Sequence, residues 1–275
     1  MLKISVLMAV YKNDNPYHFE EALSSVWDNQ ILKPFEIVLI QDGAVPKSLH
    51  QIIFKWGEKL NSSLVLIVND SNIGLTKSLN KGVKLCNGDF IARMDSDDIS
   101  SSNRFKIQSE FLENNPKIDL VGSSTQEFNE FGNLSFTKKF PANNFGLKKI
   151  IHRSSPMCHA TVMFKKKIFD DGCLYNEKYK TSQDIALWFE LLYKGYEFAN
   201  IDKVLYSVRF GEDFHKRRSY TKALNEFKIY WNGIIKNFGY SKKLIFPISR
   251  FLIRLLPSPI TKLIYYSNIR KILNS

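Results

Sequence analysis

Three carboxylates stand within four consecutive residues of the 275-residue chain, in the segment Asp95-Ser96-Asp97-Asp98. They follow the apolar run 90–92, which predicts a strand. Like charges this close repel one another, so the cluster indicates a ligand of opposite charge. The side chains of Asp95 and Asp97 would lie on the same side of an extended backbone. Two such carboxylates suit a hard divalent cation, Mn²⁺ or Mg²⁺, and leave coordination positions open for a substrate diphosphate.

Strands and helices alternate in the first hundred residues. Strand-like apolar runs cover 4–10, 35–40, 64–68 and 89–94, and helical spacing covers 18–29, 48–60 and 75–85. This alternation predicts an α/β fold, Rossmann-like, with a mostly parallel sheet flanked by helices. Ligands bind at the carboxyl ends of such strands, so we expect Tyr11, Asp42 and residues 70–72 to share a cleft with the acidic segment. The ordinary alternative is that Asp, Asn and Gly punctuate turns there.

The pattern is less regular after residue 104. Helices are predicted over 104–114 and 184–193, and strands over 120–121, 125–128, 161–164 and 204–210. We therefore expect a domain over 1–213, whose nucleotide-binding half covers about 1–100 and whose acceptor half covers about 101–213. Residues 214–275 form a separate C-terminal segment.

The net charge of +12 is concentrated in that segment. Residues 214–275 contain 13 Lys and Arg and a single acid, Glu226. Residues 242–256 predict a basic amphipathic helix, with an apolar stripe formed by Leu244, Ile245, Ile248, Phe251, Leu252 and Leu255. Basic charge beside apolar side chains suits a helix lying on an anionic membrane surface. A helix packed on the protein's own core is the alternative.

Other features bear on the compartment. The three cysteines, Cys86, Cys158 and Cys173, form no C-x-x-C pair, so neither a disulfide framework nor a zinc ribbon is expected. The N-terminus lacks the regions of a signal peptide, and no apolar run reaches the ~18 residues of a transmembrane helix. A cytoplasmic protein is the simplest expectation.

Several segments together resemble the family 2 inverting glycosyltransferases, which have the GT-A fold. The segments follow the family's order and spacing over residues 3–210. They are 5–11 (SVLMAVY), 37–43 (IVLIQDG), 72–80 (NIGLTKSLN), 88–98 (GDFIARMDSDD) and Gln183-Asp184 with Trp188. The sequence ARMDSDDI, followed by Arg104-Phe105, resembles the sequences of bacterial enzymes that extend lipid-linked O-antigen, capsule or exopolysaccharide units.

The resemblance implies a UDP-sugar donor at the strand ends. Asp42 would accept a hydrogen bond from the uracil N3–H group. The other positions that it places near the nucleotide-sugar are Ala9, Tyr11, Asn72, Arg93, Asp95 and Ser96.

The resemblance also implies a metal. Asp97 and Asp95 would hold Mn²⁺ or Mg²⁺, and His215 would complete the coordination, although the family's Tyr-Arg-His spacing is stretched here. Arg217 and Arg218 are alternative contacts to the diphosphate. The metal would stabilise the charge of the leaving diphosphate.

Asp184 is the implied catalytic base, which takes the proton of the attacking hydroxyl in a single inverting displacement. It opens the helix over 184–193, where we expect the helix dipole to keep it ionised. Alternatively, Asp184 only caps that helix. His159 either lines the acceptor side or is a structural, hydrogen-bonded histidine.

We therefore expect a hexosyltransferase that moves a hexose or N-acetylhexosamine from a UDP-sugar to a polyprenyl-diphosphate-linked saccharide in surface polysaccharide biosynthesis. It would act as a peripheral protein on the cytoplasmic face of the bacterial inner membrane. Three alternatives within the resemblance are a retaining transferase, a sugar nucleotidyltransferase and a binding-only relative; the first strand lacks the nucleotidyltransferases' Gly-rich loop. A basic nucleic-acid-binding protein is the rival class, but no RNP, zinc-finger or helix-turn-helix signature supports it, and no nucleic-acid partner is expected.

Overall fold

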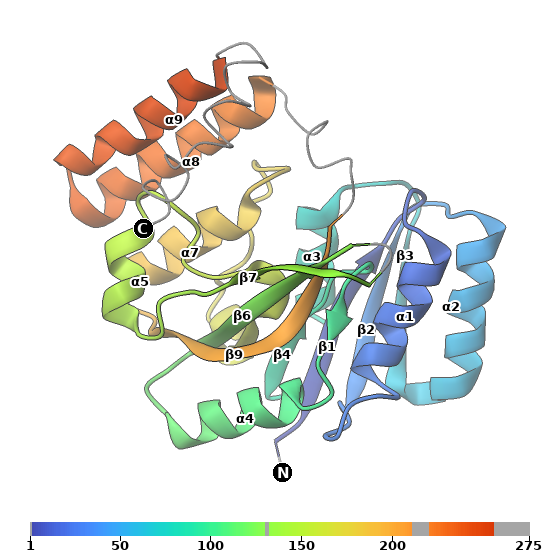
Figure 1. Cartoon of the computed structure of the whole chain (residues 1–275). Coiled ribbons are helices and arrows are strands. Elements are labelled where there is room, and N and C mark those ends of the chain that lie inside the picture. The colour runs from blue at the N-terminus through green and yellow to red at the C-terminus, as the bar shows by residue number, and fades with distance from the viewer. Residues whose placement is uncertain (1, 130–131, 211–219, 256–275) are drawn as a thin grey trace.

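The computed structural model describes residues 2–129, 132–210 and 220–255, with Leu255 described by its backbone alone. Figure 1 shows a sheet with helices on both faces and a pair of helices beyond one of them. The fold is α/β, as predicted. The strands form one sheet in the order β3-β2-β1-β4-β8-β6-β9-β5, and β7 pairs with β6 outside this path.

The first half of the sheet is parallel. Its elements are β1 (Ile4–Val10), α1 (Pro16–Val26), β2 (Glu36–Asp42), α2 (Lys47–Leu60), a 3₁₀ turn (Asn61–Ser63), β3 (Leu64–Asn69), α3 (Leu75–Val83) and β4 (Phe90–Arg93). β1 lies in the middle, between β2 and β4, and β3 pairs with β2. The predicted alternation of strands and helices is therefore confirmed. Because all four strands run the same way, their carboxyl ends meet at one edge.

The second half of the sheet is mixed. Its elements are β5 (Ile99–Ser100), α4 (Arg104–Asn114), β6 (Leu120–Phe128), β7 (Leu134–Lys138), α5 (Asn144–Ile150), a 3₁₀ turn (His159–Thr161), β8 (Met163–Lys165), α6 (Lys167–Asp170), α7 (Gln183–Tyr193) and β9 (Phe198–Arg209). β8 runs antiparallel to β4 and β6, whereas β9 runs parallel to β6. β9 then reaches back to pair with β5, directly after the acidic segment.

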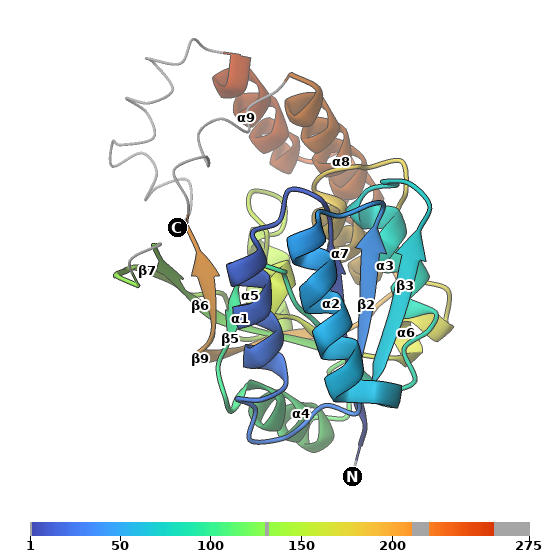
Figure 2. The ribbon, with the colours of Figure 1, turned by 90° about the vertical axis from the view of Figure 1, so that its right-hand side faces the viewer.

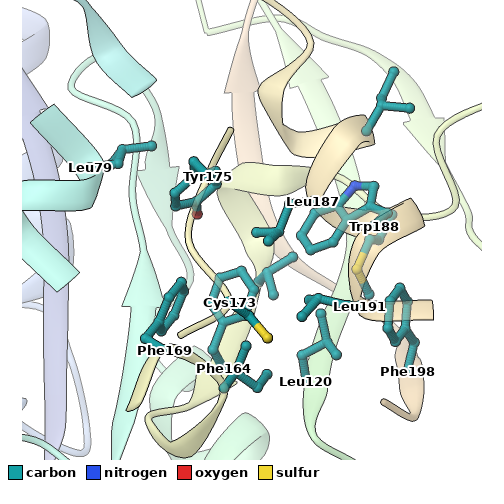
Figure 3. Packing of buried hydrophobic residues seen from close by; sticks show 14 of the residues in the cluster. Leu79, Leu120, Phe164, Phe169, Cys173, Tyr175, Leu187, Trp188, Leu191 and Phe198 are labelled. Atoms are coloured by element: carbon teal, nitrogen blue, oxygen red, sulfur yellow. The ribbon is translucent and has the colours of Figure 1, made fainter. Parts of the chain in front are cut away.

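Two hydrophobic clusters cover the two faces of the sheet. Successive side chains of a strand point to opposite faces, so Val6 and Met8 join one cluster while Leu7 joins the other. The first cluster includes residues of α1, α2 and α4. The second includes residues of α3, α5, α6, α7 and α8. Figure 3 shows Leu187 and Trp188 of α7 packed within this second cluster, which fixes α7 on the sheet.

The remaining elements are α8 (Tyr220–Phe238), a 3₁₀ turn (Lys242–Leu244) and α9 (Ile245–Leu255). α8 lies against α7, and α9 lies against α8 (Figures 1 and 2). The α7–α8 contact is close because α8 has a glycine, Gly233, facing the ring of Phe189. A Cβ atom at Gly233 would come 2.3 Å from the ring.

The structure corrects several predicted boundaries. α1 begins at Pro16 rather than 18, because the Asn15 side chain accepts hydrogen bonds from the backbone amides of Tyr17 and His18. The two short strands predicted over 120–121 and 125–128 are one strand, β6. Polar Ser123 and Ser124 interrupted the apolar pattern, yet both are buried. The three cysteines are free, as expected.

Candidate active site

The acidic segment lies between β4 and β5 and is held by the end of β9. The backbone N–H of Asp95 donates to the Tyr206 hydroxyl at 3.1 Å. The Asp98 carboxylate accepts from the backbone N–H of Arg209 at 2.8 Å, and the Arg209 side chain donates to the carbonyl oxygen of Asp97 at 2.9 Å. These contacts fix the backbone of the segment and leave the Asp97 carboxylate free of the Arg209 side chain.

The carboxylates of this segment remain crowded. One oxygen of Asp95 pairs with the buried guanidinium of Arg93 at 2.5 Å. Burial, followed by the charge of Asp95, raises the pKa of Asp97. Burial and the charges of Asp95 and Asp97 raise the pKa of Asp98 further. A cation bound here would relieve this repulsion.

Arg93 is 2 % exposed and is incompletely paired. Its Nη2 atom contacts Asp95, whereas Nε and Nη1 have no hydrogen-bond partner among the residues that the structure describes. Unpaired buried donors cost free energy. The guanidinium is therefore suited to an additional anionic or carbonyl ligand.

The donor set fits the predicted metal in part. No group of three or more His, Cys, Asp and Glu side chains that could hold an ion occurs in the described ranges. Asp95 and Asp97 provide carboxylate oxygens, which Mn²⁺ and Mg²⁺ accept, and a two-carboxylate site leaves room for ligand oxygens. His215, Arg217 and Arg218, predicted to complete this site, lie outside the described residues.

Asp14 is a residue of this site that the sequence analysis missed. Its carboxylate accepts hydrogen bonds from the backbone N–H of Tyr11 at 3.0 Å and from the Ser96 hydroxyl at 2.9 Å. Burial raises its pKa to about 6, and the charges of Asp97 and Asp95 contribute. Asp14 therefore connects the end of β1 to the acidic segment. The sequence offered one sign of this role: Asp14 follows three residues after Tyr11, at the end of a predicted strand.

Asp42 ends β2, as predicted, and its carboxylate is already engaged. Oδ1 accepts from the Asn69 side chain at 3.0 Å and from the backbone N–H of Ile73 at 2.9 Å. Oδ2 accepts from the backbone N–H of Gly74 at 2.9 Å. Asp42 thus orders the loop after β3, and Oδ2 keeps capacity to accept one further donor.

The other predicted nucleotide positions lie at the same edge. Ala9 is half-buried in β1 and Tyr11 is 40 % exposed just after it. Asn72 donates to the carbonyl oxygen of Asp42 at 3.4 Å. Gly43 has φ +87°, and a Cβ there would come 2.7 Å from the Asn72 nitrogen. The close approach of these two loops therefore requires glycine.

Asp184 lies in the first turn of α7, after Ser182, which has a left-handed backbone (φ 58°). We expected the start of the helix to favour the ionised form of Asp184. The backbone amides of Ile185 and of Asp184 itself do lower its pKa, but burial has the larger effect and raises the pKa above its ordinary value. The charges of Glu226 and Asp95 raise the pKa further. A raised pKa makes the carboxylate a stronger base.

Tyr175 contacts His159 and is within reach of the charges of the acidic segment and of Asp184. The charges of Arg93, Asp184 and Asp95 all act on the Tyr175 hydroxyl, whose pKa is raised mainly by burial. The hydroxyl lies 2.7 Å from Nε2 of His159. The His159 ring contacts Trp188 edge-on, and burial, with the nearby Arg93 charge, holds the pKa of His159 well below its usual range. His159 is thus a hydrogen-bonded, neutral histidine next to α7.

The C-terminal helix divides the predicted apolar stripe. Ile245, Ile248 and Leu252 are exposed on α9. Leu244 packs against the second hydrophobic cluster, and Phe251 contacts Phe227 of α8. α9 therefore packs one face on the protein and presents another to solvent. Within the described ranges, no helix is both long and apolar enough to cross a membrane.

The α8–α9 contact is centred on one carboxylate. Glu226 of α8 is buried and accepts from Arg250 at 2.9 Å and from Arg254 at 2.6 Å. The Arg250 guanidinium also lies over the ring of Tyr230, 5.2 Å from its centroid. The segment's single acid is therefore used to hold α9.

Comparison with known proteins gives consistent matches. The model of the family "Glycosyl transferase family 2" matches residues 5–173. The chain is 37 % identical, over 98 % of both chains, to an Escherichia coli UDP-Gal:alpha-D-GlcNAc-diphosphoundecaprenol beta-1,3-galactosyltransferase. It is 32 % identical to the amylovoran biosynthesis glycosyltransferase AmsE of Erwinia amylovora, over 95 % of this chain and 97 % of that one.

Solved structures match the fold. S. aureus TarS 1-349 in complex with UDP-GlcNAc has a TM-score of 0.64 at 20 % identity, over 98 % of this chain and 74 % of that chain. The mannosyltransferase PcManGT from Pyrobaculum calidifontis, in complex with GDP-Man and Mn²⁺, has a TM-score of 0.63 at 12 % identity, over 99 % of this chain and 83 % of that chain. The predicted GT-A fold is thereby confirmed.

Proposed function

Since the chain belongs to glycosyltransferase family 2 and is a transferase with the GT-A fold, we propose that it moves a hexose or N-acetylhexosamine from a UDP-sugar to a polyprenyl-diphosphate-linked saccharide. The observation that carries this proposal is the acidic segment at the carboxyl edge of the sheet, where Asp95 pairs with the buried and incompletely paired Arg93. The charges of Arg93, Asp95 and Asp184 all act on Tyr175, which supports placing the base near the donor. The relative named for transfer from UDP-Gal to a diphosphoundecaprenol-linked GlcNAc supports the two substrate classes.

Each residue has a role in the proposed reaction. Asp42, Asn72, Ala9 and Tyr11 bind the uridine end. Arg93 pairs with Asp95 and adds positive charge beside the acidic segment, which favours the donor's diphosphate.

The acceptor side supplies the base. Asp184 takes the proton from the acceptor hydroxyl as that oxygen attacks the anomeric carbon opposite the leaving UDP, so the anomeric configuration inverts. Asp95 and Asp97 hold Mn²⁺ or Mg²⁺, which supplies positive charge to the leaving diphosphate when bound. Asp14 holds the acidic segment against β1 through Ser96.

The proposal includes a place for the protein in the cell. The exposed Ile245, Ile248 and Leu252 of α9, with basic side chains around them, suit the surface of an anionic bilayer. The cytoplasmic face of the inner membrane would present both the nucleotide-sugar and the lipid-linked acceptor. A flotation assay with anionic and neutral liposomes tests this part, and equal flotation of the wild type and a variant with polar residues at these three positions contradicts it.

The test of the activity is a screen of UDP-sugars against a lipid-diphosphate-linked monosaccharide, with and without Mn²⁺ or Mg²⁺. We expect metal-dependent transfer, with inversion at the anomeric carbon seen by NMR of the product. Full activity in excess chelator contradicts the metal site. A product with retained configuration contradicts the single displacement.

A further inference from the structure

Arg104, the first residue of α4, is fully buried and lies against the residues that lead into the acidic segment. Its Nη2 atom donates to the carbonyl oxygen of Arg93 at 2.8 Å, and its Nη1 atom lies 3.8 Å from the sulfur of Met94. Its Nε atom donates to the Gln108 side chain at 2.9 Å. Every nitrogen of this guanidinium therefore has a partner, whereas Nε and Nη1 of Arg93 have none among the described residues. Arg104 is thus engaged entirely with the protein itself.

The carbonyl oxygen of Arg93, at the end of β4, depends on this contact. The backbone N–H of Arg93 donates to the carbonyl oxygen of Val162 at 2.9 Å, as in an antiparallel pair. The N–H of Val162 does not return the bond, because it donates to the carbonyl oxygen of His159 in the 3₁₀ turn before β8. Arg104 takes its place at the Arg93 oxygen. The guanidinium therefore completes the hydrogen bonding of β4 two residues before the acidic segment begins.

The same guanidinium also supports the first residue of the acidic segment. It lies over the ring of Tyr206, 5.1 Å from the ring centroid, where a cation is attracted to the face of the ring. The Tyr206 hydroxyl accepts the backbone N–H of Asp95 at 3.1 Å. Arg104 thus acts on the segment by two routes, directly at the Arg93 carbonyl and through Tyr206 at Asp95.

Gln108, one turn further along α4, fixes the guanidinium in its turn. Its amide nitrogen donates to the carbonyl oxygens of Val121 at 3.1 Å and Thr161 at 2.8 Å, while its amide oxygen accepts from Arg104. Gln108 is fully buried as well. The contacts connect α4, β6 and the turn before β8 to the end of β4. A buried polar network whose members are all satisfied is rigid, so it provides a firm support for the segment.

The positive charge of Arg104 is not what suits it to this place. None of the salt bridges within the described ranges involves Arg104. Burial lowers the pKa of Arg104 to about 10, so the side chain stays charged at neutral pH. A buried charge without a carboxylate contact costs free energy, and it also repels a cation bound at the acidic segment. The useful property of Arg104 is therefore its planar set of donors, which reaches several partners at once.

We propose that Arg104 is a positioning residue for the donor site, which holds the acidic segment in its binding conformation before the cation and the diphosphate arrive. This inference rests on the proposed function and adds a buried residue that acts through the Arg93 carbonyl and Tyr206. Holding the segment in advance removes the entropy cost of ordering it when the ligands bind. Asp95 and Asp97 then meet the ligands with their backbone already fixed.

The test measures Mn²⁺ binding to the full chain in the presence of UDP by electron paramagnetic resonance, which requires no transfer of sugar. Arg104→Met removes the guanidinium. Arg104→Lys keeps the charge but replaces the planar fork by a single ammonium group. Tyr206→Phe keeps the ring under Arg104 and removes only the acceptor of the Asp95 amide. Hydrogen exchange of residues 94–98 without ligands measures how firmly the segment is held.

Asn200→Leu is the matched control. Asn200 is a buried side chain that also binds two backbone carbonyls, those of Pro141 at 2.9 Å and Pro156 at 3.1 Å, and neither belongs to the acidic segment. Its replacement should lower the midpoint of thermal unfolding. Mn²⁺ affinity and exchange of residues 94–98 should stay at their wild-type values.

We expect Arg104→Met to raise the Kd of Mn²⁺ by roughly tenfold or more, since a buried charge-assisted hydrogen bond is lost. Arg104→Lys should fall between this variant and the wild type, and Tyr206→Phe should raise the Kd by about three- to tenfold. Residues 94–98 should exchange faster in each of the three variants. KM for the donor should rise in the same order, while KM for the acceptor stays unchanged.

Other roles for Arg104 predict different results. If only its charge mattered, Arg104→Met would bind Mn²⁺ more tightly, because a repelling charge is removed, and Arg104→Lys would match the wild type. If Arg104 only stabilised the fold, its variants would have a lower unfolding midpoint and an unchanged Mn²⁺ affinity per folded molecule, as in the control. Either result overturns the inference.

Tyr206→Phe decides the test if Arg104→Met does not fold, because it leaves the buried network intact. Unchanged Mn²⁺ affinity together with unchanged exchange in Tyr206→Phe overturns the inference.

Failure of the inference is distinct from failure of the proposed function. Sugar transfer by the wild type, with Arg104 variants that bind Mn²⁺ as the wild type does, overturns the inference and leaves the function standing. A wild type that binds no UDP contradicts the function. Hydrogen exchange then still decides the inference: faster exchange of residues 94–98 in the variants supports the hold by Arg104, and unchanged exchange overturns it.

Discussion

The acidic segment and the α8–α9 contact differ in the balance of carboxylates and cationic side chains. In the acidic segment, the carboxylates of the described residues have a salt bridge to Arg93 alone, and the pKa values of Asp97 and Asp98 are raised. In the α8–α9 contact a single carboxylate, Glu226, has two arginines. One region has excess negative charge and the other has excess positive charge. The acidic segment therefore suits a bound cation, whereas the contact of Glu226 with two arginines holds α9 on α8.

The largest expected effect tests the base that both regions adjoin. Asp184→Asn keeps the size of the side chain and cannot accept a proton, so kcat should fall by roughly 10²–10⁴-fold. UDP binding, measured by calorimetry, should persist. Glu190→Gln on the same helix is the control, because Glu190 pairs with Lys236 away from the site and should leave kcat near normal. A near-normal kcat for Asp184→Asn would place the base elsewhere.

The next prediction tests the excess negative charge. Asp97→Asn removes one of the two carboxylates proposed to hold the metal, so kcat should fall on the order of 10²-fold or more. The concentration of Mn²⁺ needed for half-maximal activity should rise. Asp28→Asn, which removes a surface carboxylate paired with Lys59, is the control. Unchanged metal dependence in Asp97→Asn would remove this residue from the site.

The third prediction tests how much the α8–α9 contact contributes to the stability of the fold. Deleting residues 242–275 removes Arg250 and Arg254 from Glu226 and Phe251 from Phe227, and exposes the face of α8 that α9 covers. We expect a loss of about 2–3 kcal/mol in the free energy of unfolding, mostly from apolar surface returned to water. Glu226→Gln in the shortened chain should change this little, because the carboxylate is then exposed to water. Denaturant unfolding measures both, and an unchanged midpoint would show that α9 contributes nothing to the fold.

A smaller effect is expected at the connection between β1 and the acidic segment. Asp14→Ala leaves the Tyr11 amide and the Ser96 hydroxyl without their acceptor, which costs about 1–3 kcal/mol. Asp14→Asn keeps an acceptor oxygen and should recover most of the stability and the KM for the donor. If the two substitutions weaken donor binding equally, the charge of Asp14 matters rather than the hydrogen bonds.

The smallest expected effect is a shift in pH dependence. Protonated Asp184 cannot act as base, so kcat should fall as pH falls through its raised pKa, above the ordinary value of 3.8. Glu226→Gln removes a neighbouring negative charge and should move this acid limb to lower pH by less than about one unit. Glu190→Gln should leave it in place. Movement of the limb to higher pH in Glu226→Gln would contradict the coupling.

The sequence predicted the first half of the fold closely, because its strands are continuous apolar runs and each ends in a polar turn. The strands predicted over 35–40, 64–68 and 89–94 agree within two residues with β2, β3 and β4. β6 was divided in the prediction because Ser123 and Ser124 are polar, and only tertiary hydrogen bonds, such as that of Ser123 to Thr161, make their burial acceptable.

The site was predictable where a motif is local and was missed where partners come from far apart. The acidic segment and Asp184 stand out by composition and by resemblance. Tyr206 and Arg209 lie 111 residues from the groups that they bind, so no local pattern reveals those contacts. The raised pKa of Asp184 depends on burial in the folded chain and on the charge of Glu226, neither of which a helix-start pattern contains.

The return of β9 to the acidic segment also sets an order of events during synthesis. The residues proposed to hold the donor and metal are all made by residue 98, yet the bonds from Tyr206 and Arg209 exist only once the chain has reached β9. Until then the crowded carboxylates lack the groups that fix their backbone. Contacts so distant along the chain close late, since loop closure over long separations is slow. The emerging chain therefore carries Asp42, Asp95 and Asp97 well before the contacts that fix the acidic segment can form.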